Sequence, residues 1–206
     1  MTGELRITDF LERLAAATPT PGGGSAAALT ASLAASLVAM VAALTQKARP
    51  ASDPELAAQM GEICEEARRW RDRFLRLADE DALAFEGVLA AYRLPKDPER
   101  ERRESAIQAA LRQATEIPYE VALGARRVLE LAEVVALKGL KSAWSDAGAG
   151  IYLAEAALQA ALLNVAINIK SIKDEEFVSR YEERRRELSE WAAAQRRRVM
   201  ESFISP

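Results

Sequence analysis

Residues 18–45 read TPTPGGGSAAALTASLAASLVAMVAALT, and this stretch decides the kind of fold to expect. Two prolines and three glycines within residues 18–24 oppose regular structure, and Ser25 is suited to cap a helix that runs to about Gln46. From Ser25 to Thr45 no residue is charged, and most are alanine, serine or threonine. Because small side chains let helices approach closely, we expect this helix at the centre of a bundle or at a helix–helix interface.

The same uncharged segment is long enough to span a bilayer, which is the competing interpretation. Its large apolar residues are few and scattered among small ones. This composition favours a tightly packed helix of a soluble protein, so we expect no association with a membrane.

The rest of the chain also has helical periodicity between breaks made by proline, glycine or capping residues. The pair Asp53–Pro54 precedes a helix of about 40 residues, and Pro118 is expected to kink or interrupt a later one. The expected helices span residues 8–17, 25–46, 55–92, 97–137, 145–171 and 175–203.

No segment is predicted to form a strand, so the predicted fold class is all-α. We expect one domain over residues 1–206, built as an elongated bundle of about six helices. A bundle of this kind needs a cover for its small-residue face, and a homodimer is the simplest way to provide one.

The composition excludes several classes of function. The 206 residues include 28 basic and 31 acidic side chains, so no basic excess is available for nucleic acid. Histidine is absent and Cys64 is the single cysteine, which excludes Ser-His-Asp triads, Cys-His pairs and nearly all common zinc sites. A lone cysteine suits the reducing cytoplasm, where we expect the protein to act.

Four groups of residues are candidates for a functional site. Pro21, Gly22, Gly23, Gly24 and Ser25 precede a helix, where free backbone N–H groups can bind an anion or oxyanion, although a tight structural turn has the same sequence. Asp81 falls on an apolar helical stripe, so it is either used in chemistry or held in an ion pair with Lys96 or an arginine. Its neighbours Asp79 and Glu80 are expected to face solvent.

The third and fourth groups lie on one apolar helix. Ser145 and Asp146 open it and are suited to capping. Asn164 and Asn168 share a face four residues apart, where their amides bridge helices or line a pocket. The arginine triplets at 184–186 and 196–198 alternate with glutamates, which is typical of a solvated helix face and not of RNA binding.

These features occur in a distinctive order. The blocks are TPGGGSAAAL at 20–29, AMVAALT at 39–45, DEDALAF at 79–85, AYRLPK at 91–96, AIQAA at 106–110, SD at 145–146 and NVAIN at 164–168. Together they resemble the formiminotransferase-cyclodeaminase C-terminal domain family. The resemblance implies an all-α dimer that acts on C–N bonds of one-carbon tetrahydrofolates, as a methenyltetrahydrofolate cyclohydrolase or a formiminotetrahydrofolate cyclodeaminase.

The resemblance also implies a folate pocket near the glycine turn, Asp81 and the helix start at Ser145. In that pocket Asp81 and Asp146 are the expected proton-transferring or cation-stabilising carboxylates. Lys96 is expected to pair with a carboxylate or with the glutamate tail, and Asn164 and Asn168 to hold the pocket geometry. We expect a tetrahydrofolate derivative as substrate, with no tightly bound cofactor and no metal.

One departure from the family pattern bears on activity. Before the Ser-Asp pair the family usually has Gly-Asn-x-Asn, whereas this chain has Gly139-Leu140-Lys141-Ser142. Loss of two amides favours a different substrate or a loss of activity if those amides contact ligand. The alternative function is therefore a non-catalytic folate-binding or helical scaffold homologue.

Overall fold

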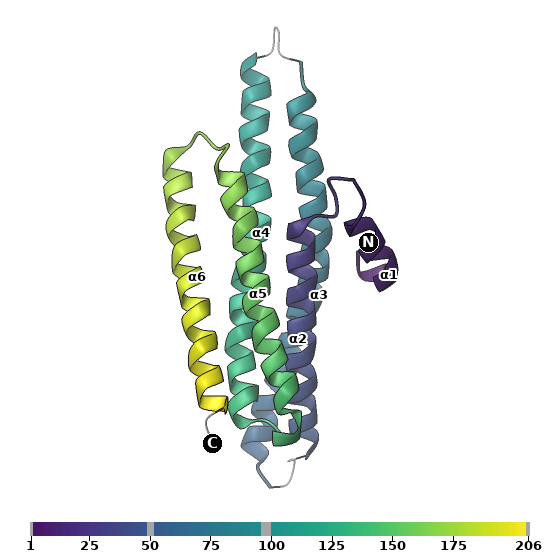
Figure 1. Ribbon diagram of the computed structural model, residues 1–206, viewed down its shortest axis with the longest axis vertical. Coiled ribbons are helices and arrows are strands. Elements are labelled where there is room, and N and C mark those ends of the chain that lie inside the picture. Colours follow the sequence, from purple (N-terminus) through teal and green to yellow (C-terminus); the bar gives the residue numbers. More distant parts are fainter. Residues whose placement is uncertain (1, 49–51, 96–99, 205–206) are drawn as a thin grey trace.

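The computed structural model describes residues 2–48, 52–95 and 100–204 (Figure 1). These residues form only helices. The α-helices are α1 (Ile7–Leu14), α2 (Gly23–Ala48), α3 (Pro54–Arg93), α4 (Arg100–Lys138), α5 (Trp144–Ile169) and α6 (Glu175–Ile204), with short 3₁₀ helices η1 (Thr2–Glu4) and η2 (Lys141–Ala143). The predicted all-α fold, with a 40-residue helix, is confirmed.

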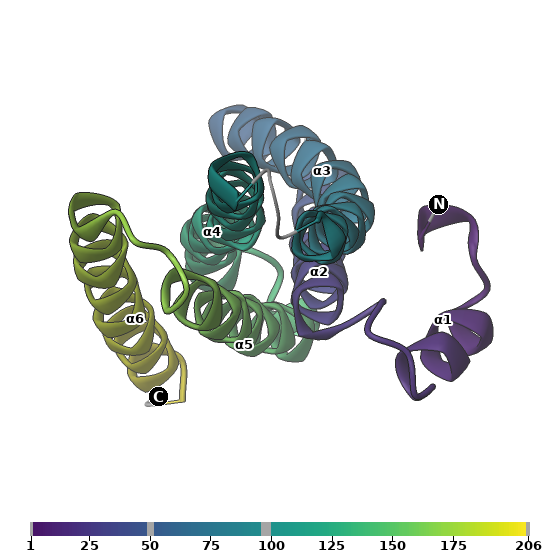
Figure 2. The ribbon, with the colours of Figure 1, turned by 90° about the horizontal axis from the view of Figure 1, so that it is seen from above.

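Helices α2, α3, α4 and α5 form an elongated four-helix bundle. α2 packs against α3 and α5, and α4 packs against the same two helices, while α6 lies along α5 and α4 (Figure 1). Seen from above, α1 stands beside the bundle on the side opposite α6 (Figure 2).

The core explains why α2 is rich in small residues. Ala28, Ala31 and Ala35 are completely buried, and larger side chains such as Phe74 of α3 and Leu158 of α5 fill the space that they leave. Small residues on α2 therefore let α3 and α5 come close to the same helix, as the sequence predicted.

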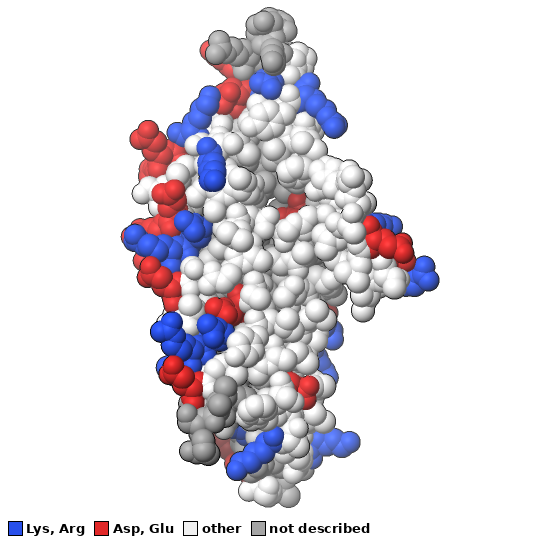
Figure 3. All heavy atoms as spheres, viewed as in Figure 1, with Lys and Arg blue, Asp and Glu red and all other residues white. Residues whose placement is uncertain are grey.

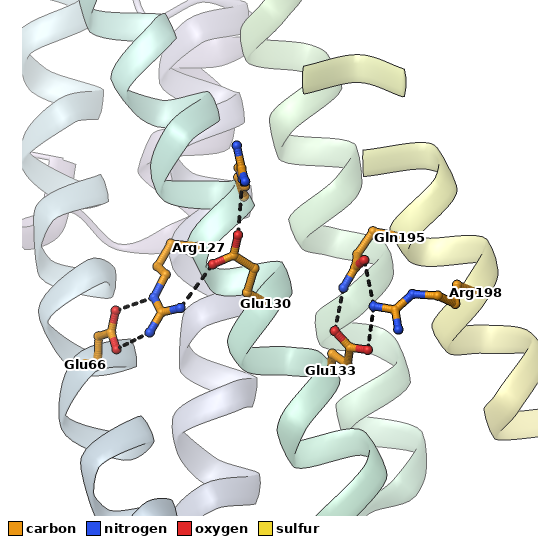
Figure 4. A network of polar contacts seen from close by, with 7 residues as sticks. Glu66, Arg127, Glu130, Glu133, Gln195 and Arg198 are labelled. Atoms are coloured by element: carbon orange, nitrogen blue, oxygen red, sulfur yellow. Dashed lines mark hydrogen bonds and ion pairs between the residues drawn. The ribbon is translucent and has the colours of Figure 1, made fainter. Parts of the chain in front are cut away.

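Ion pairs and hydrogen bonds connect neighbouring helices on the charged faces of the bundle. Arg127 of α4 makes two contacts with Glu66 of α3, at 2.7 and 2.9 Å. Glu133 of α4 binds Gln195 and Arg198 of α6 (Figure 4). These contacts hold α3 and α6 against α4, away from the exposed side of α2 and α5.

Two predicted interruptions are wrong. Gly23 and Gly24 lie inside α2, in its first turn, whose backbone N–H groups have no intrahelical acceptor. α4 continues through Pro118, which is buried within it, so the helix is not interrupted there, and the alternative of a kink stays a prediction. The predicted helix start at Asp97–Pro98 lies outside the described residues.

Capping was also predicted incorrectly at two helices. Ser25 lies in the first turn of α2 and binds another helix. α5 begins at Trp144 after Ala143, so Ser145 and Asp146 sit within its first turn and do not cap it. By contrast, Asp53 accepts a hydrogen bond from the backbone N–H of Leu56, which confirms the predicted start of α3.

Two segments are long and apolar enough to cross a membrane, by length and composition alone. They are α2 and residues Lys141–Ile169, and about half of each apolar window is already buried inside the bundle, 56% and 44% respectively. Core helices of soluble proteins meet the same test.

One broad face of the molecule carries few charges. In the space-filling view, uncharged atoms cover much of the area over α2 and α5, with charged side chains concentrated toward the edges (Figure 3). The exposed large apolar side chains of these two helices are Leu33, Met40 and Leu44 on α2 and Trp144, Tyr152, Leu163 and Ile167 on α5.

Candidate functional site

A cleft of about 140 Å³ lies at the N-terminal end of α2. α2, α3, α4 and α5 all contribute to its walls. The lining residues are Pro19, Thr20, Gly22, Gly23, Gly24, Asp81, Phe85, Ala114, Asn164, Ile167 and Asn168. The structure therefore brings together the glycine turn, Asp81 and the two asparagines, as the sequence predicted.

Gly24 and Asp81 meet at the floor of this cleft. A Cβ atom at position 24 would overlap the Asp81 carboxylate, whose atoms are its three nearest neighbours. Gly23 differs, because its Cβ would lie 3.5 Å from the amide nitrogen of Asn164, an ordinary contact. Glycine is thus required at position 24 for the backbone of α2 to approach the carboxylate.

Ser25 connects α2 to this carboxylate. Its Oγ lies 3.1 Å from Oδ2 of Asp81 and 3.0 Å from the carbonyl oxygen of Ala78, and its backbone N–H also donates to Asp81. Its hydroxyl can donate to the Ala78 carbonyl and accept from a protonated Asp81, or it can donate to the ionised form. The site therefore accommodates both protonation states of Asp81.

Burial raises the pKa of the Asp81 carboxyl above its ordinary value, and the hydrogen bonds from the side chain and backbone of Ser25 oppose this rise. No described arginine or lysine forms an ion pair with Asp81, whereas Lys96 lies outside the described residues. A carboxyl with a raised pKa in a cleft is suited to accept and return a proton.

The two asparagines have different partners. Asn164 donates to the carbonyl oxygen of Ala160 in its own helix at 2.9 Å, and Asn168 donates to that of Ala114 in α4 at 2.6 Å. Pro118 has no N–H to give to Ala114, so Asn168 replaces the missing helical donor. Among the described residues, nothing donates to either side-chain amide oxygen, so both can accept from a ligand.

Several predicted site residues lie elsewhere. Ser145 and Asp146 are at the opposite end of α5, and 18 residues of helix place Asp146 about 27 Å from Asn164. Within one chain, Asp81 and Asp146 therefore do not share a hollow. Pro21 lines a neighbouring hollow with Thr2, Arg13 and Asp79.

Asp79 is held by another segment, contrary to the prediction, whereas the Glu80 side chain is 39% exposed, as predicted. Asp79 accepts hydrogen bonds from the backbone and hydroxyl of Thr2 at 2.7 and 2.6 Å. Glu80 pairs with Arg73. η1 covers Asp79 on α3, which sequence periodicity does not show.

Sequence reasoning missed Phe85 and Ile167 as walls of the cleft. Phe85 is 38% exposed and follows Asp81 by four residues, so the helical spacing that singled out Asp81 could also have identified it. Ile167, between the two asparagines, is 59% exposed, which no sequence pattern indicates.

The cleft combines three chemical capabilities. It has a carboxyl that can move a proton, amide oxygens that can accept hydrogen bonds, and an exposed aromatic ring beside the first turn of a helix. In the described part of the chain, no group of three or more acidic or cysteine side chains is placed to hold a metal ion.

Comparisons with known proteins agree on one family. The profile of the formiminotransferase-cyclodeaminase family matches residues 6–187. A methenyltetrahydrofolate cyclohydrolase of Methylorubrum extorquens is 40% identical over 190 residues, which is 91% of this chain and 89% of that protein. A formimidoyltransferase-cyclodeaminase of Gallus gallus is 34% identical over 170 residues, 82% of this chain but only 31% of that protein.

A solved structure also matches. The formiminotetrahydrofolate cyclodeaminase of Thermotoga maritima superimposes with a TM-score of 0.89 and 29% sequence identity, covering 98% of both chains. The whole bundle is thus shared, and not only the cleft.

Proposed function

Because the chain belongs to the formiminotransferase-cyclodeaminase family, we propose that it is a one-carbon tetrahydrofolate enzyme acting on C–N bonds, and that its reaction is methenyltetrahydrofolate hydrolysis. The cyclohydrolase relative is 40% identical to this chain, against 29% for the Thermotoga maritima cyclodeaminase and 34% for the Gallus gallus protein, which favours this reaction over deamination. The observation that carries the proposal is the Asp81 carboxyl, with its raised pKa, held against Gly24 in a cleft.

The proposed hydrolysis begins at the methenyl carbon, which shares a positive charge with N5 and N10. The Asp81 carboxylate takes a proton from water as the water oxygen bonds to this carbon. Asp81 then returns a proton to N5 as the C–N5 bond breaks, and the hydroxyl proton leaves as the formyl carbonyl forms. The balance is methenyl cation plus water to 10-formyltetrahydrofolate plus one proton.

The second candidate is the cyclodeaminase reaction, favoured by the relatives in Thermotoga maritima and Gallus gallus. Here N10 attacks the formimino carbon and ammonia leaves after protonation, so the reaction is that of a lyase. Both reactions pass through a tetrahedral carbon between two nitrogens, and Asp81 serves both as the proton-transferring group.

We assign binding roles to the other residues of the cleft. The backbone of Gly22, Gly23 and Gly24 orients the substrate, and Asn164 and Asn168 accept hydrogen bonds from its pterin ring. Lys96 is a proposed contact of the substrate, whereas Pro21 and Ser145 lie outside this cleft. A tetrahydrofolate derivative is the substrate, with no tightly bound cofactor and no metal.

The proposed enzymatic activity is tested with purified protein and two substrates. With methenyltetrahydrofolate we expect the ring absorbance to decay faster than in buffer alone, and with 5-formiminotetrahydrofolate we expect slower or no release of ammonia. Faster release of ammonia would assign the deaminase reaction instead. Thermal stabilisation by reduced folates without any turnover would support the non-catalytic binder, and neither effect would support the scaffold.

We also propose that the protein is a cytoplasmic homodimer that binds neither nucleic acid nor membrane. The uncharged face over α2 and α5 supports the dimer, and the net charge of −3 gives no electrostatic basis for nucleic acid. The buried, free Cys64 suits a reducing compartment. Sedimentation in detergent-free buffer should give twice the mass of the chain, whereas a monomer or a need for detergent would contradict this assembly.

A further inference from the structure

Phe85 is an aromatic ring that the core of the bundle does not use. Its neighbours on α3, Ala84 and Val88, are buried, whereas Phe85 is 38% exposed and forms one wall of the cleft. Burial of an aromatic ring contributes strongly to the stability of a core, and this ring gives up much of that contribution. Its place in the cleft indicates contact with a ligand.

Phe85 also differs from two other exposed rings in what lies over its face. Tyr92 carries the guanidinium of Arg103 at 5.9 Å from the ring centroid, and Tyr152 carries that of Arg196 at 5.8 Å. No described arginine or lysine lies over Phe85, and no described aromatic ring stacks on it. The electron-rich face of this ring is therefore available to a cation from outside the chain.

The proposed substrate supplies such a cation. In methenyltetrahydrofolate, one positive charge is delocalised over the methenyl carbon and its two nitrogens, and the addition of water removes that charge. A planar cation whose charge is delocalised is weakly hydrated, as the guanidinium of arginine is, so it moves from water onto a ring face at little cost.

The spacing of Phe85 and Asp81 suits a single cation. The two residues are four apart on α3, which places their Cβ atoms about 5–6 Å apart on one side of the helix. A cation attracted to an aromatic face lies within about 6 Å of the ring centroid. The methenyl carbon can therefore contact the Phe85 ring while the attacking water is held by the Asp81 carboxylate.

We propose that Phe85 is a specificity-determining residue, whose ring face binds the methenyl cation and distinguishes it from neutral folates. This role rests on the proposed function. Once water has added, the one-carbon group is no longer attracted to the ring, so the neutral product is bound less tightly than the substrate and leaves more readily.

A series of ring variants separates the effect of charge from that of contact area. Phe85 is replaced by 4-fluorophenylalanine and by 3,4,5-trifluorophenylalanine, because fluorine withdraws electron density from the ring face and changes its size little. Binding is measured in the Asp81→Asn background, in which we expect slow turnover, with methenyltetrahydrofolate and with 5-formyltetrahydrofolate, whose one-carbon group is neutral.

We expect the Kd of methenyltetrahydrofolate to rise stepwise with fluorination, by about 3- to 30-fold in total, and the Kd of 5-formyltetrahydrofolate to stay nearly constant. A ring that only provides apolar contact area would hold both folates equally, since that contact does not depend on ligand charge. Equal changes for the two folates, or no change with fluorination, would overturn the proposal.

Steady-state kinetics with natural side chains give a second test. Phe85→Leu should raise the KM for methenyltetrahydrofolate several-fold with little loss of kcat, because the ring attracts the cation of the ground state. Tyr92→Leu is the matched control, since it removes an exposed ring of the same helix that already carries Arg103, and its KM should equal that of wild type.

The two tests distinguish this inference from the proposed function. Binding that weakens with fluorination, but no turnover by wild type, would refute the proposed reaction and keep the role of Phe85. Wild-type turnover with an unchanged KM in Phe85→Leu would refute the role of Phe85 and keep the reaction.

Discussion

At the scale of single residues, the close contact between Gly24 and Asp81 sets the geometry of the site. The absence of a side chain at position 24 lets the first turn of α2 press against a carboxyl, and Ser25 supplies two hydrogen bonds to that same group. The position of the Asp81 carboxyl therefore depends on the absence of a Cβ atom at position 24.

We predict that Gly24→Ala lowers turnover of the folate substrate by about 100-fold, because the new Cβ displaces the Asp81 carboxylate. Gly87→Ala is the matched control. A Cβ at position 87 of α3 has open space around it, so this variant should keep its activity and gain about 0.5–1 kcal/mol of stability. Steady-state kinetics and urea unfolding measure the two effects, and equal activity in both variants would contradict the contact.

The second prediction concerns pH. The raised pKa means that folded protein holds the Asp81 proton more tightly than the unfolded chain does. The stability that this group contributes is fully present below its unfolded pKa of about 3.9 and is lost as pH rises through the folded pKa. Compared with Asp81→Asn, wild type should therefore lose free energy of unfolding as pH rises from about 4. Urea unfolding of both proteins across this range gives the difference, which should be constant if the pKa is not raised.

At this scale, the sequence indicated Asp81 because a carboxylate on an apolar stripe is unusual. It could not indicate the contact with Ser25, which is 56 positions away in sequence and depends on the register of α2 against α3. For the same reason, Asp79 was expected in solvent, although Thr2 covers it.

At the scale of the elements, α5 supplies a hydrogen-bond donor that α4 lacks. Pro118 removes a donor that the carbonyl of Ala114 would normally receive, and Asn168 of α5 replaces it at 2.6 Å. The sequence predicted a kink or an interruption at Pro118, because sequence rules consider only the hydrogen bonds within the proline's own helix. The partner that preserves the helix comes from a different element, so local rules do not find it.

We predict that Asn168→Ala destabilises the protein by about 1–3 kcal/mol, because it leaves the Ala114 carbonyl without its donor. Asn164→Ala, whose amide bonds its own helix, should cost less. Pro118→Ala restores a backbone donor, so the double variant with Asn168→Ala should recover part of the loss. A cycle of urea unfolding measurements tests this coupling, and strictly additive effects would contradict it.

At the scale of the whole molecule, the uncharged face over α2 and α5 governs the assembly (Figure 3). The small-residue character of α2 and the all-α class could be predicted because helical periodicity extends through the chain. The separation of Asp81 from Asp146 could not, because it depends on which ends of the helices meet once α5 runs antiparallel to α2.

A dimer that unfolds to monomers must become more stable as its concentration rises. We predict that a 100-fold increase in protein concentration adds about 2.7 kcal/mol of apparent stability and raises Tm by several degrees. Ala156→Arg places a charge on the exposed side of α5, within the uncharged face, so this variant should be monomeric with a Tm independent of concentration. A wild-type Tm that does not change with concentration would count against the dimer.

The most direct test of the account compares two carboxylates that lie two residues apart. Turnover of methenyltetrahydrofolate should fall about 10²- to 10⁴-fold in Asp81→Asn, because the proton-transferring group is lost. It should stay close to wild type in Asp79→Asn, whose carboxylate holds Thr2 outside the cleft. Wild-type turnover in Asp81→Asn, or an equal loss in both variants, would contradict the assignment of Asp81 as the reacting group.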